Sequence, residues 1–280
     1  MEPMGERVLC LGAGAVTGGG WQLGVVLGLA DEGLRLADAD RIIGTSAGAL
    51  VGAHLALGRT PSQTAELLLG LPVDGRLVRP AAIARLGVAQ VWPSRRHALV
   101  WLGRAALAQD WSQERSEEWA ATLGTGLTGV DWPSGLVIVA VDALSGRPAY
   151  FTADSGVPLA HAVAATCALP GVFPPVLVEG RPHFDGGLRS LVNLDLAHGA
   201  EAAVAIAPFS ASARPHRRPT EQAKLLDGTR LALLEPDRES RRAIGLDPVV
   251  AGRATRALAA GREFGRRQAA RVREVWEGTA

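Results

Sequence analysis

A single serine stands between two glycines in the stretch Gly44-Thr45-Ser46-Ala47-Gly48. Branched apolar residues precede this stretch and small or aliphatic residues follow it, which indicates a strand that turns directly into a helix. Gly-x-Ser-x-Gly at such a junction is the pattern of a nucleophile elbow, in which a sharp turn exposes the serine hydroxyl. The N-terminus of the following helix would favour developing negative charge. We therefore predict that Ser46 is a nucleophile, with an ordinary helix N-cap serine as the alternative.

A nucleophilic serine needs a base, and two kinds of residue could supply it. A triad would use a histidine later in the chain. The histidines are His54, His97, His161, His183, His198 and His216. Of these, His183 alone lies near a motif, PHFDGG, but that motif centres on Asp185, where a strand ends and Gly186 and Gly187 permit a tight turn. A plain Asp-Gly-Gly turn is the alternative, so these residues alone leave the base open.

A glycine-rich turn is expected at residues 12–20, directly after the first strand. Such a turn could bind a dinucleotide, but that function needs an acidic residue at the end of the second strand. The second strand ends Ile42-Ile43-Gly44, without an acid. The other interpretation is an oxyanion hole, because consecutive free N–H groups at a helix start can bind the oxygen of a tetrahedral intermediate.

Composition limits the classes of function. The chain has 280 residues, of which 48 % are hydrophobic, enough for one large α/β domain or two small ones. The formal net charge of +1 gives no reason to expect nucleic acid as a partner. Two cysteines, Cys10 and Cys167, suggest neither a disulfide framework nor a metal site. We expect no metal and no cofactor.

No apolar run is long enough to cross a bilayer, so we expect a cytoplasmic protein, with peripheral membrane contact left open. The sequence carries no signal for an oligomeric state.

Strands and helices alternate from the N-terminus, which predicts a parallel sheet covered on both faces. We expect strands at residues 7–11, 39–43, 136–141, 148–152, 176–184 (bent at Gly180) and 203–207, and helices at residues 21–31, 47–57 and 249–276. Residues 210–220 are expected to form a polar, basic loop. Residues 71–134 have weak strand signals and hold five of the seven tryptophans, so we predict a mostly helical insertion. These tryptophans either pack within the insertion or contact lipid.

Four blocks of this sequence, taken together and in order, resemble the patatin-like phospholipase family of serine acyl hydrolases. The blocks are LCLGAGAVTG at residues 9–18, GTSAG at residues 44–48, AVAATCALPGVFPP at residues 162–175 and FDGG at residues 184–187. The first block departs from the family's usual Gly-Gly-Gly-x-Arg-Gly, since Ala13 to Gly18 contain no arginine and one residue is added after them.

The resemblance implies a Ser–Asp dyad without histidine, with Ser46 as nucleophile and Asp185 as general base. It implies backbone N–H groups of Gly14, Ala15 and Thr17 as the oxyanion hole. The supporting glycines of the two motifs are Gly44, Gly48, Gly186 and Gly187. A partly desolvated carboxylate in hydrogen-bond reach of the hydroxyl could take its proton and return it to the leaving alcohol.

We therefore predict a single three-layer α/β/α domain over residues 1–280 with a mainly parallel central sheet. A helical cap is expected at about 71–134 and a C-terminal docking helix at about 249–277. The predicted function is serine-dependent hydrolysis of phospholipid, lysophospholipid or simpler acyl esters through an acyl-enzyme. The alternatives are a small-ester or thioester hydrolase using the same site, and a non-catalytic nucleotide-binding or regulatory protein using residues 12–20.

Overall fold

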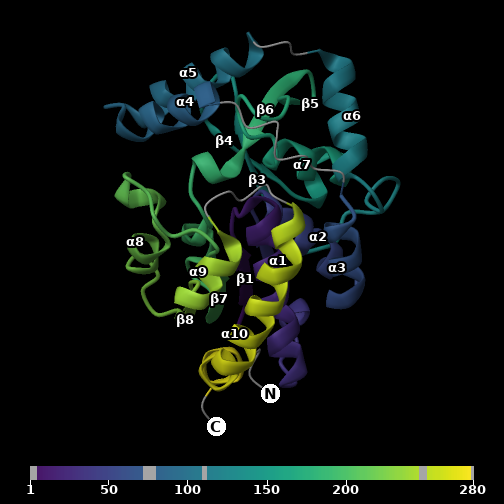
Figure 1. Ribbon diagram of the computed structural model, residues 1–280, viewed down its shortest axis with the longest axis vertical. Helices are drawn as coiled ribbons and strands as arrows, with labels where there is room; N and C mark the ends of the chain where they lie inside the picture. The colour runs from purple at the N-terminus through teal and green to yellow at the C-terminus, as the bar shows by residue number, and fades with distance from the viewer. Residues whose placement is uncertain (1–4, 72–79, 109–111, 246–250, 279–280) are drawn as a thin grey trace.

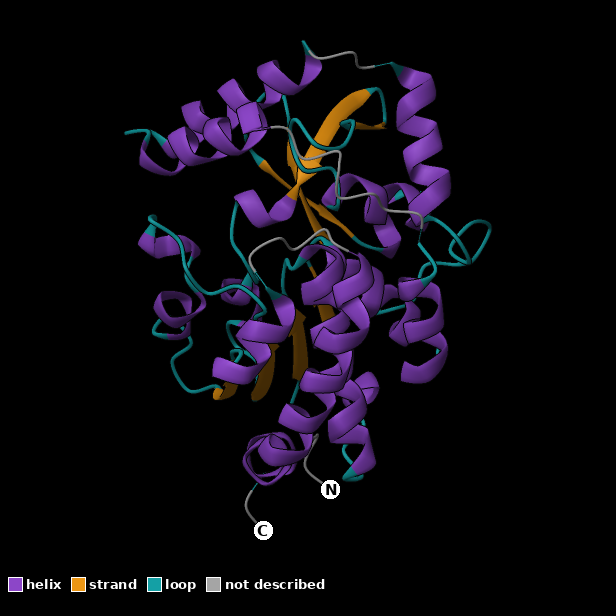
Figure 2. Ribbon diagram, viewed as in Figure 1, coloured by secondary structure: helices purple, strands orange, loops and turns teal. Residues whose placement is uncertain are grey.

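One mixed sheet forms the centre of the protein, with helices packed around it (Figures 1 and 2). The computed structural model describes residues 5–71, 80–108, 112–245 and 251–278. Within these residues the strands are β1 (Arg7–Leu11), β2 (Arg41–Gly44), β3 (Leu136–Asp142), β4 (Pro148–Phe151), β5 (Val176–Val178), β6 (Arg181–Asp185), β7 (Ala202–Ile206) and β8 (Arg230–Leu234). Their order across the sheet is β5-β6-β3-β2-β1-β7-β8, and β4 pairs with β3 outside this path.

The described helices agree with the predicted alternation of strand and helix. They are α1 (Ala15–Asp31), α2 (Ala47–Ala56), α3 (Pro61–Leu69), α4 (Pro80–Val91), α5 (Arg95–Leu107), α6 (Gln113–Leu123), α7 (Leu159–Thr166), α8 (Pro219–Ala223), α9 (Arg238–Ile244) and α10 (Ala251–Glu277). Strands β3, β2, β1, β7 and β8 run parallel to their neighbours in this part of the sheet. The predicted α/β/α fold with a parallel centre is confirmed, and an antiparallel edge of β4, β5 and β6 extends it.

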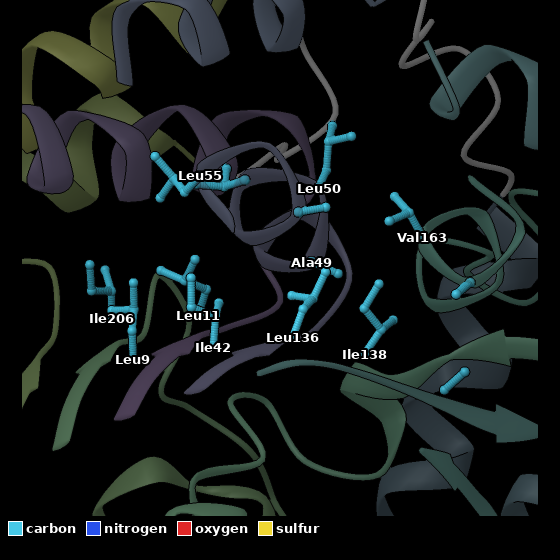
Figure 3. Packing of buried hydrophobic residues seen from close by; sticks show 14 of the residues in the cluster. Leu9, Leu11, Ile42, Ala49, Leu50, Leu55, Leu136, Ile138, Val163 and Ile206 are labelled. Atoms are coloured by element: carbon cyan, nitrogen blue, oxygen red, sulfur yellow. The ribbon is translucent and has the colours of Figure 1, made fainter. Parts of the chain in front are cut away.

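The central strands are buried on both faces, as parallel strands are when helices and loops cover them. Leu9 and Leu11 of β1 belong to the larger apolar cluster, in which Ala49 and Leu50 of α2 also lie (Figure 3). Val8 and Cys10 point to the opposite face, where residues 191–200 complete a second cluster. Alternate side chains of β1 thus enter two cores, which explains why the strand reads as continuously apolar.

Helix α10, the predicted C-terminal docking helix, lies against α1 (Figure 1). Glycines on both helices allow a very close approach. A Cβ atom at Gly24 of α1 would lie 2.1 Å from the carbonyl oxygen of Leu258, and one at Gly261 of α10 would lie 2.2 Å from that of Trp21. Glycines recur at four-residue spacing on both sides of this contact, at positions 20, 24 and 28 and at positions 261 and 265. The first of these glycines, Gly20, falls within the turn predicted at residues 12–20, but α1 already begins at Ala15 and contains it.

Several boundaries differ from the sequence predictions for local reasons. The single bent strand expected at residues 176–184 is a hairpin of β5 and β6. Its two loop residues, Glu179 and Gly180, both have positive φ, which is the backbone that a two-residue hairpin turn needs. Strand β8 and helix α9 were not predicted. The loop expected at residues 210–220 contains a 3₁₀ turn at Pro215–Arg217, and α8 begins at its end.

The predicted insertion at residues 71–134 contains α4, α5 and α6, while residues 72–79 and 109–111 lie outside the described residues. Trp111 and the predicted start of the C-terminal helix, residues 249–250, lie outside them as well. Two tryptophans of the insertion bind main-chain carbonyls, because the Nε1 atoms of Trp119 and Trp132 donate to Ala164 and Leu136 at 3.2 and 3.1 Å. None of the described helices is both long and apolar enough to cross a membrane.

Candidate active site

Ser46 lies at the apex of the turn between β2 and α2, with φ 54° and ψ −128°. Such a positive φ strains a residue that has a Cβ atom, and strain of this kind concentrates at functional sites. The flanking glycines allow the turn to be this tight. A Cβ atom at Gly48 would lie 2.3 Å from the carbonyl oxygen of Leu11, and one at Gly44 would lie 2.5 Å from the Cα atom of Ala49. The local geometry is therefore that of a nucleophile elbow.

Asp185 ends strand β6, and its carboxylate faces Ser46. The Oγ atom of Ser46 donates to Oδ2 of Asp185 at 2.8 Å. The other carboxylate oxygen, Oδ1, accepts from the backbone N–H of Gly187 at 2.7 Å. The order β6-β3-β2 explains this meeting, since β3 pairs with both the strand that leads to Ser46 and the strand that ends at Asp185.

The two glycines after Asp185 are required by close packing. A Cβ atom at Gly186 would lie 2.0 Å from the carbonyl oxygen of Val139 on β3. One at Gly187 would lie 2.8 Å from the Cβ atom of Ala13 and 2.9 Å from Oδ1 of Asp185. The two glycines of the Asp-Gly-Gly sequence thus allow more than a turn, because they let the backbone after Asp185 pack against β3 and against Ala13 in the glycine-rich block before α1.

Burial sets the acidity of Asp185. The residue is 6 % exposed. Desolvation raises the pKa of Asp185 to about 6, against the lowering effects of the hydrogen bonds from Ser46 and Gly187 and of the positive charge of Arg217. A carboxylate with a pKa near 6 is ionised at neutral pH and is a stronger base than an exposed aspartate.

Thr166, the last residue of α7, supports the turn that carries Ser46. Its Oγ1 atom accepts the backbone N–H of Ser46 at 2.9 Å and donates to the carbonyl oxygen of Val139. Asn193 supports the neighbouring residue, because its Nδ2 atom donates to Oγ1 of Thr45 at 2.8 Å. Our sequence analysis missed both residues. Thr166 lies inside the block at residues 162–175 that resembles the family, and this block was the sequence signal that could have identified it.

The first turn of α1 borders the site. Its first helical hydrogen bond runs from Gly18 N to Gly14 O, so the N–H groups of Ala15 and Val16 precede the helical ladder. Gly14, Ala15 and Val16 line the same cavity as Ser46. Ala15 has φ 47°, a strained value for alanine. Thr17, which we expected to donate, is fully buried and is not among the residues that line this cavity.

A cavity of about 210 Å³ opens over Ser46 and Asp185. Apart from these two residues and Arg217, most of its side chains are apolar. The apolar side chains are contributed mainly by α2, α3, α6 and the loops that follow α7, β6 and β7: Leu50, Leu68, Leu71, Trp119, Leu123, Leu169, Phe173, Leu188, Leu191 and Phe209. Trp119 stacks on Phe173, with ring centroids 4.1 Å apart. The cavity therefore suits an aliphatic chain attached to a polar group near Ser46.

Arg217 is the cationic side chain of this cavity, and the sequence analysis did not single it out. It is 6 % exposed, its Nη2 atom donates to Gly187 O at 2.7 Å, and its Nε atom has no partner in the described residues. Burial lowers the pKa of Arg217 to about 10, a change that the charge of Asp185 opposes. Its side chain therefore stays charged at neutral pH and supports the turn that holds Asp185.

Other reactive side chains are poorly placed to replace this pair. All six histidines lie in the described residues, and none lines the cavity. Nδ1 of His183 hydrogen-bonds with the carbonyl oxygen of Arg181, and burial lowers the pKa of His183. Cys167 lines the cavity, but burial raises the pKa of its thiol well above the usual value, so the thiol is protonated at neutral pH. The described residues include no group of three or more His, Cys, Asp or Glu side chains arranged to hold a metal ion.

Comparisons with known proteins bear on the family and the fold of the chain. A family model described as patatin-like phospholipase matches residues 9–198. The crystal structure of VipD from Legionella pneumophila is similar, with a TM-score of 0.50 and 13 % identity over 96 % of this chain and 67 % of that chain. The crystal structure of the type III effector protein ExoU has a TM-score of 0.45 and 16 % sequence identity. The match covers 96 % of this chain and 54 % of that chain. At such identities, the likeness to VipD concerns the fold. No curated protein sequence matches the chain.

Proposed function

The chain belongs to the patatin-like phospholipase family and is an ester hydrolase, and from this premise we propose that it cleaves lipid acyl esters with a dyad of Ser46 and Asp185. One observation carries the proposal: Oγ of Ser46 donates to a buried carboxylate at 2.8 Å, inside an apolar cavity. The proposed substrates are phospholipids, lysophospholipids or simpler esters with an aliphatic acyl chain, and the apolar lining of the cavity supports this choice.

In the proposed reaction, Oγ of Ser46 attacks the carbonyl carbon of the ester while Oδ2 of Asp185 takes the hydroxyl proton. The carbonyl oxygen becomes an oxyanion that backbone N–H groups at the start of α1 would bind, those of Gly14 and Ala15 foremost. The tetrahedral intermediate then collapses. The C–O bond to the alcohol breaks, and Asp185 returns the proton to the leaving oxygen. Water, activated by the same carboxylate, hydrolyses the acyl-serine and restores the free enzyme.

Donors to the oxyanion are proposed on the basis of position. Gly14 and Ala15 line the cavity with Ser46, and so does Val16, whereas Thr17 does not. We therefore replace Thr17 by Val16 in the proposed set. These N–H groups lie at the N-terminus of a 17-residue helix, whose dipole adds to the stabilisation of negative charge.

We also propose that residues 1–280 form one domain in which the helices of the insertion cap the cavity. Two residues of α6, Trp119 and Leu123, line the cavity, which supports this role. A small-ester or thioester hydrolase on the same site is the second candidate. The non-catalytic alternative is not proposed, because the chain belongs to a family of ester hydrolases.

A fluorophosphonate probe tests the nucleophile. The probe should label Ser46, as identified by mass spectrometry of the digested protein, and labelling should disappear in Ser46→Ala. A panel of synthetic phospholipids, lysophospholipids, short-chain esters and acyl thioesters, each at equal concentration, then separates the candidates. Preference for chains of eight carbons or fewer, with no turnover of phospholipid, would favour the small-ester function.

A further inference from the structure

Helix α4 has an apolar outer surface that the described residues leave uncovered. Between Pro80 and Trp92, every exposed residue is apolar or glycine: Pro80, Ala81, Ile83, Ala84, Gly87, Val88, Val91 and Trp92. The three largest aliphatic side chains, Ile83, Val88 and Val91, are 59 %, 45 % and 74 % exposed. The opposite side packs on the protein through Ala82 and Ala89.

This distribution is unlike that of an ordinary surface helix. A helix on the surface of a soluble protein normally turns charged side chains to water and apolar ones to the core. In α4 the two polar residues, Arg85 and Gln90, are only partly exposed, while the aliphatic ones face outward. Contiguous exposed apolar patches mark sites of contact with proteins or membranes.

Positive charge surrounds the C-terminal end of this helix. Nη2 of Arg214 donates to Ala89 O at 2.8 Å and also to Trp92 O, so the guanidinium caps the last turn of α4. The neighbouring Arg95 and Arg218 likewise donate to main-chain carbonyls, of Arg189 at 3.3 Å and Ser212 at 2.6 Å.

None of these three arginines forms a direct ion pair within the described residues, although Arg95 lies within electrostatic reach of Asp195. In the part of the chain that the structure describes, the ion pairs with carboxylates involve other residues, and Arg95, Arg214 and Arg218 take part in none of them. An apolar surface beside unpaired cations matches one partner chemically, an anionic lipid surface, where acyl chains meet negative headgroups. A second copy of the same face would bring like charges together, which disfavours self-association.

The inner side of α4 borders the region of the catalytic cavity. Leu86 and Ala89 line a small cavity together with Leu188 and Arg217, and the last two residues also line the cavity over Ser46. The inner side of α4 is therefore connected to the wall of the substrate cavity through Leu188 and Arg217. Trp92, 37 % exposed and stacked on Trp101, adds a residue type that favours the membrane–water interface.

We propose that the outer face of α4, together with Arg95, Arg214 and Arg218, docks on an anionic lipid bilayer. This inference rests on the proposed function in one respect, since the bilayer would supply the substrate. It also places the lipid contact mainly on aliphatic side chains, whereas the sequence left the tryptophans either packed within the insertion or in contact with lipid. The exposed apolar surface belongs mainly to Ile83, Val88 and Val91, whereas Trp119 and Trp132 are held by hydrogen bonds to the protein.

Co-sedimentation with vesicles tests the docking directly. The full chain should bind vesicles that contain phosphatidylglycerol at least tenfold more tightly than vesicles of phosphatidylcholine alone. The double substitution Ile83→Gln and Val91→Gln should weaken binding to the anionic vesicles at least tenfold, because it removes apolar surface. Glutamine is a good helix former, so the substitution is compatible with the helix. The matched control replaces two other exposed aliphatic residues, Leu144→Gln and Leu225→Gln, which are 51 % and 62 % exposed, and should bind like the wild type.

Activity provides the second readout. Turnover of phospholipid in anionic vesicles should fall with binding in the Ile83→Gln/Val91→Gln variant, while turnover of a monomeric short-chain ester should stay unchanged. Unchanged binding of this variant overturns the docking proposal, and equal wild-type binding to both kinds of vesicle overturns the anionic partner. A concentration-dependent dimer that the variant loses, seen by analytical ultracentrifugation, would assign the face to a second copy instead.

Failure of the docking and failure of the proposed function give different results. The Ser46→Ala variant should bind anionic vesicles as tightly as the wild type, because the docking face does not include the nucleophile. Tight binding without any lipid hydrolysis would leave the docking in place and refute the lipid hydrolase. Hydrolysis of dispersed lipid without vesicle binding would do the reverse.

Discussion

Ser46 and Asp185 are 139 positions apart in the chain, yet their side chains share a 2.8 Å hydrogen bond. Strand β3 makes this contact possible, because it lies between β2, which leads to the serine, and β6, which ends at the aspartate. Oδ2 of the carboxylate accepts the hydrogen bond from the Ser46 hydroxyl, and Oδ1 accepts one from the Gly187 N–H.

Removing either member of the pair should abolish ester hydrolysis. Ser46→Ala and Asp185→Asn should each lower kcat on a soluble ester by about 10⁴-fold, and the double variant should be hardly worse, because residues that act as a unit are not additive. Steady-state kinetics with the four proteins measures this. Losses that multiply in the double variant would mean that the two residues act independently. Circular dichroism of each variant controls for folding.

The pH dependence of kcat/KM should report the acidity of Asp185. With a pKa of about 6, the carboxylate must lose its proton to act as a base, so activity should fall as the pH drops below about 6. Arg217→Gln should move the acidic limb of the kcat/KM profile to higher pH, since the charge of Arg217 lowers the pKa of Asp185. Arg217→Lys, which keeps the charge, is the matched control. If Arg217→Gln is folded but the acidic limb of its kcat/KM profile does not move, then Arg217 does not influence the pKa of Asp185.

Asp185 should also lower the stability of the protein at alkaline pH. Its pKa is raised on folding from 3.8 to about 6, so its contribution to the free energy of unfolding is fully present below pH 3.8 and is lost as the pH rises through 6. Asp185→Asn stays neutral and should be more stable than the wild type at pH 8, by up to about 3 kcal/mol. Urea unfolding at pH 8 and pH 5 checks this, and the difference should shrink at pH 5. A variant that is less stable at both values would contradict the sign.

Thr166 should matter for the position of the nucleophile. Thr166→Val keeps the shape of the side chain but removes the acceptor for Ser46 N–H and the donor to Val139 O. We expect kcat to fall between about 10-fold and 100-fold with a smaller change in KM, because small displacements of a reacting group are costly. Thr166→Ser keeps the hydroxyl and should retain most of the activity. Equal activity of the valine and serine variants would show that packing alone is required at this position.

No histidine should be essential. His183→Gln should retain at least about half of the wild-type kcat, because Nδ1 of His183 is bonded to Arg181 O and the residue does not line the cavity over Ser46. The same assay applied to His54→Gln, a buried histidine whose ring contacts Arg59, serves as the comparison. A loss in His183→Gln of the size expected for Ser46→Ala would support a triad in place of the dyad.

The sequence by itself determined the local features of the site. Gly44, Ser46 and Gly48 specify the elbow, because only small residues fit a turn in which a Cβ atom would meet the carbonyl of Leu11. The Asp-Gly-Gly motif likewise specifies a carboxylate at a strand end. Apolar periodicity predicted β1, α2 and β3 closely, since each buries side chains in a pattern that repeats within a few residues.

The family resemblance implied that Ser46 and Asp185 meet, but the residues alone left the base open, and only the tertiary structure supplies the physical reason for their contact. Sheet order brings Asp185 rather than a histidine to Ser46, and no local pattern encodes which strands become neighbours. The roles of Thr166 and Arg217 depend on atoms of distant segments, the carbonyls of Val139 and Gly187. The exposed face of α4 could not be read from its composition either. An apolar helix is normally buried, and whether other elements cover Ile83 and Val91 is settled by packing, which acts between segments far apart in the chain.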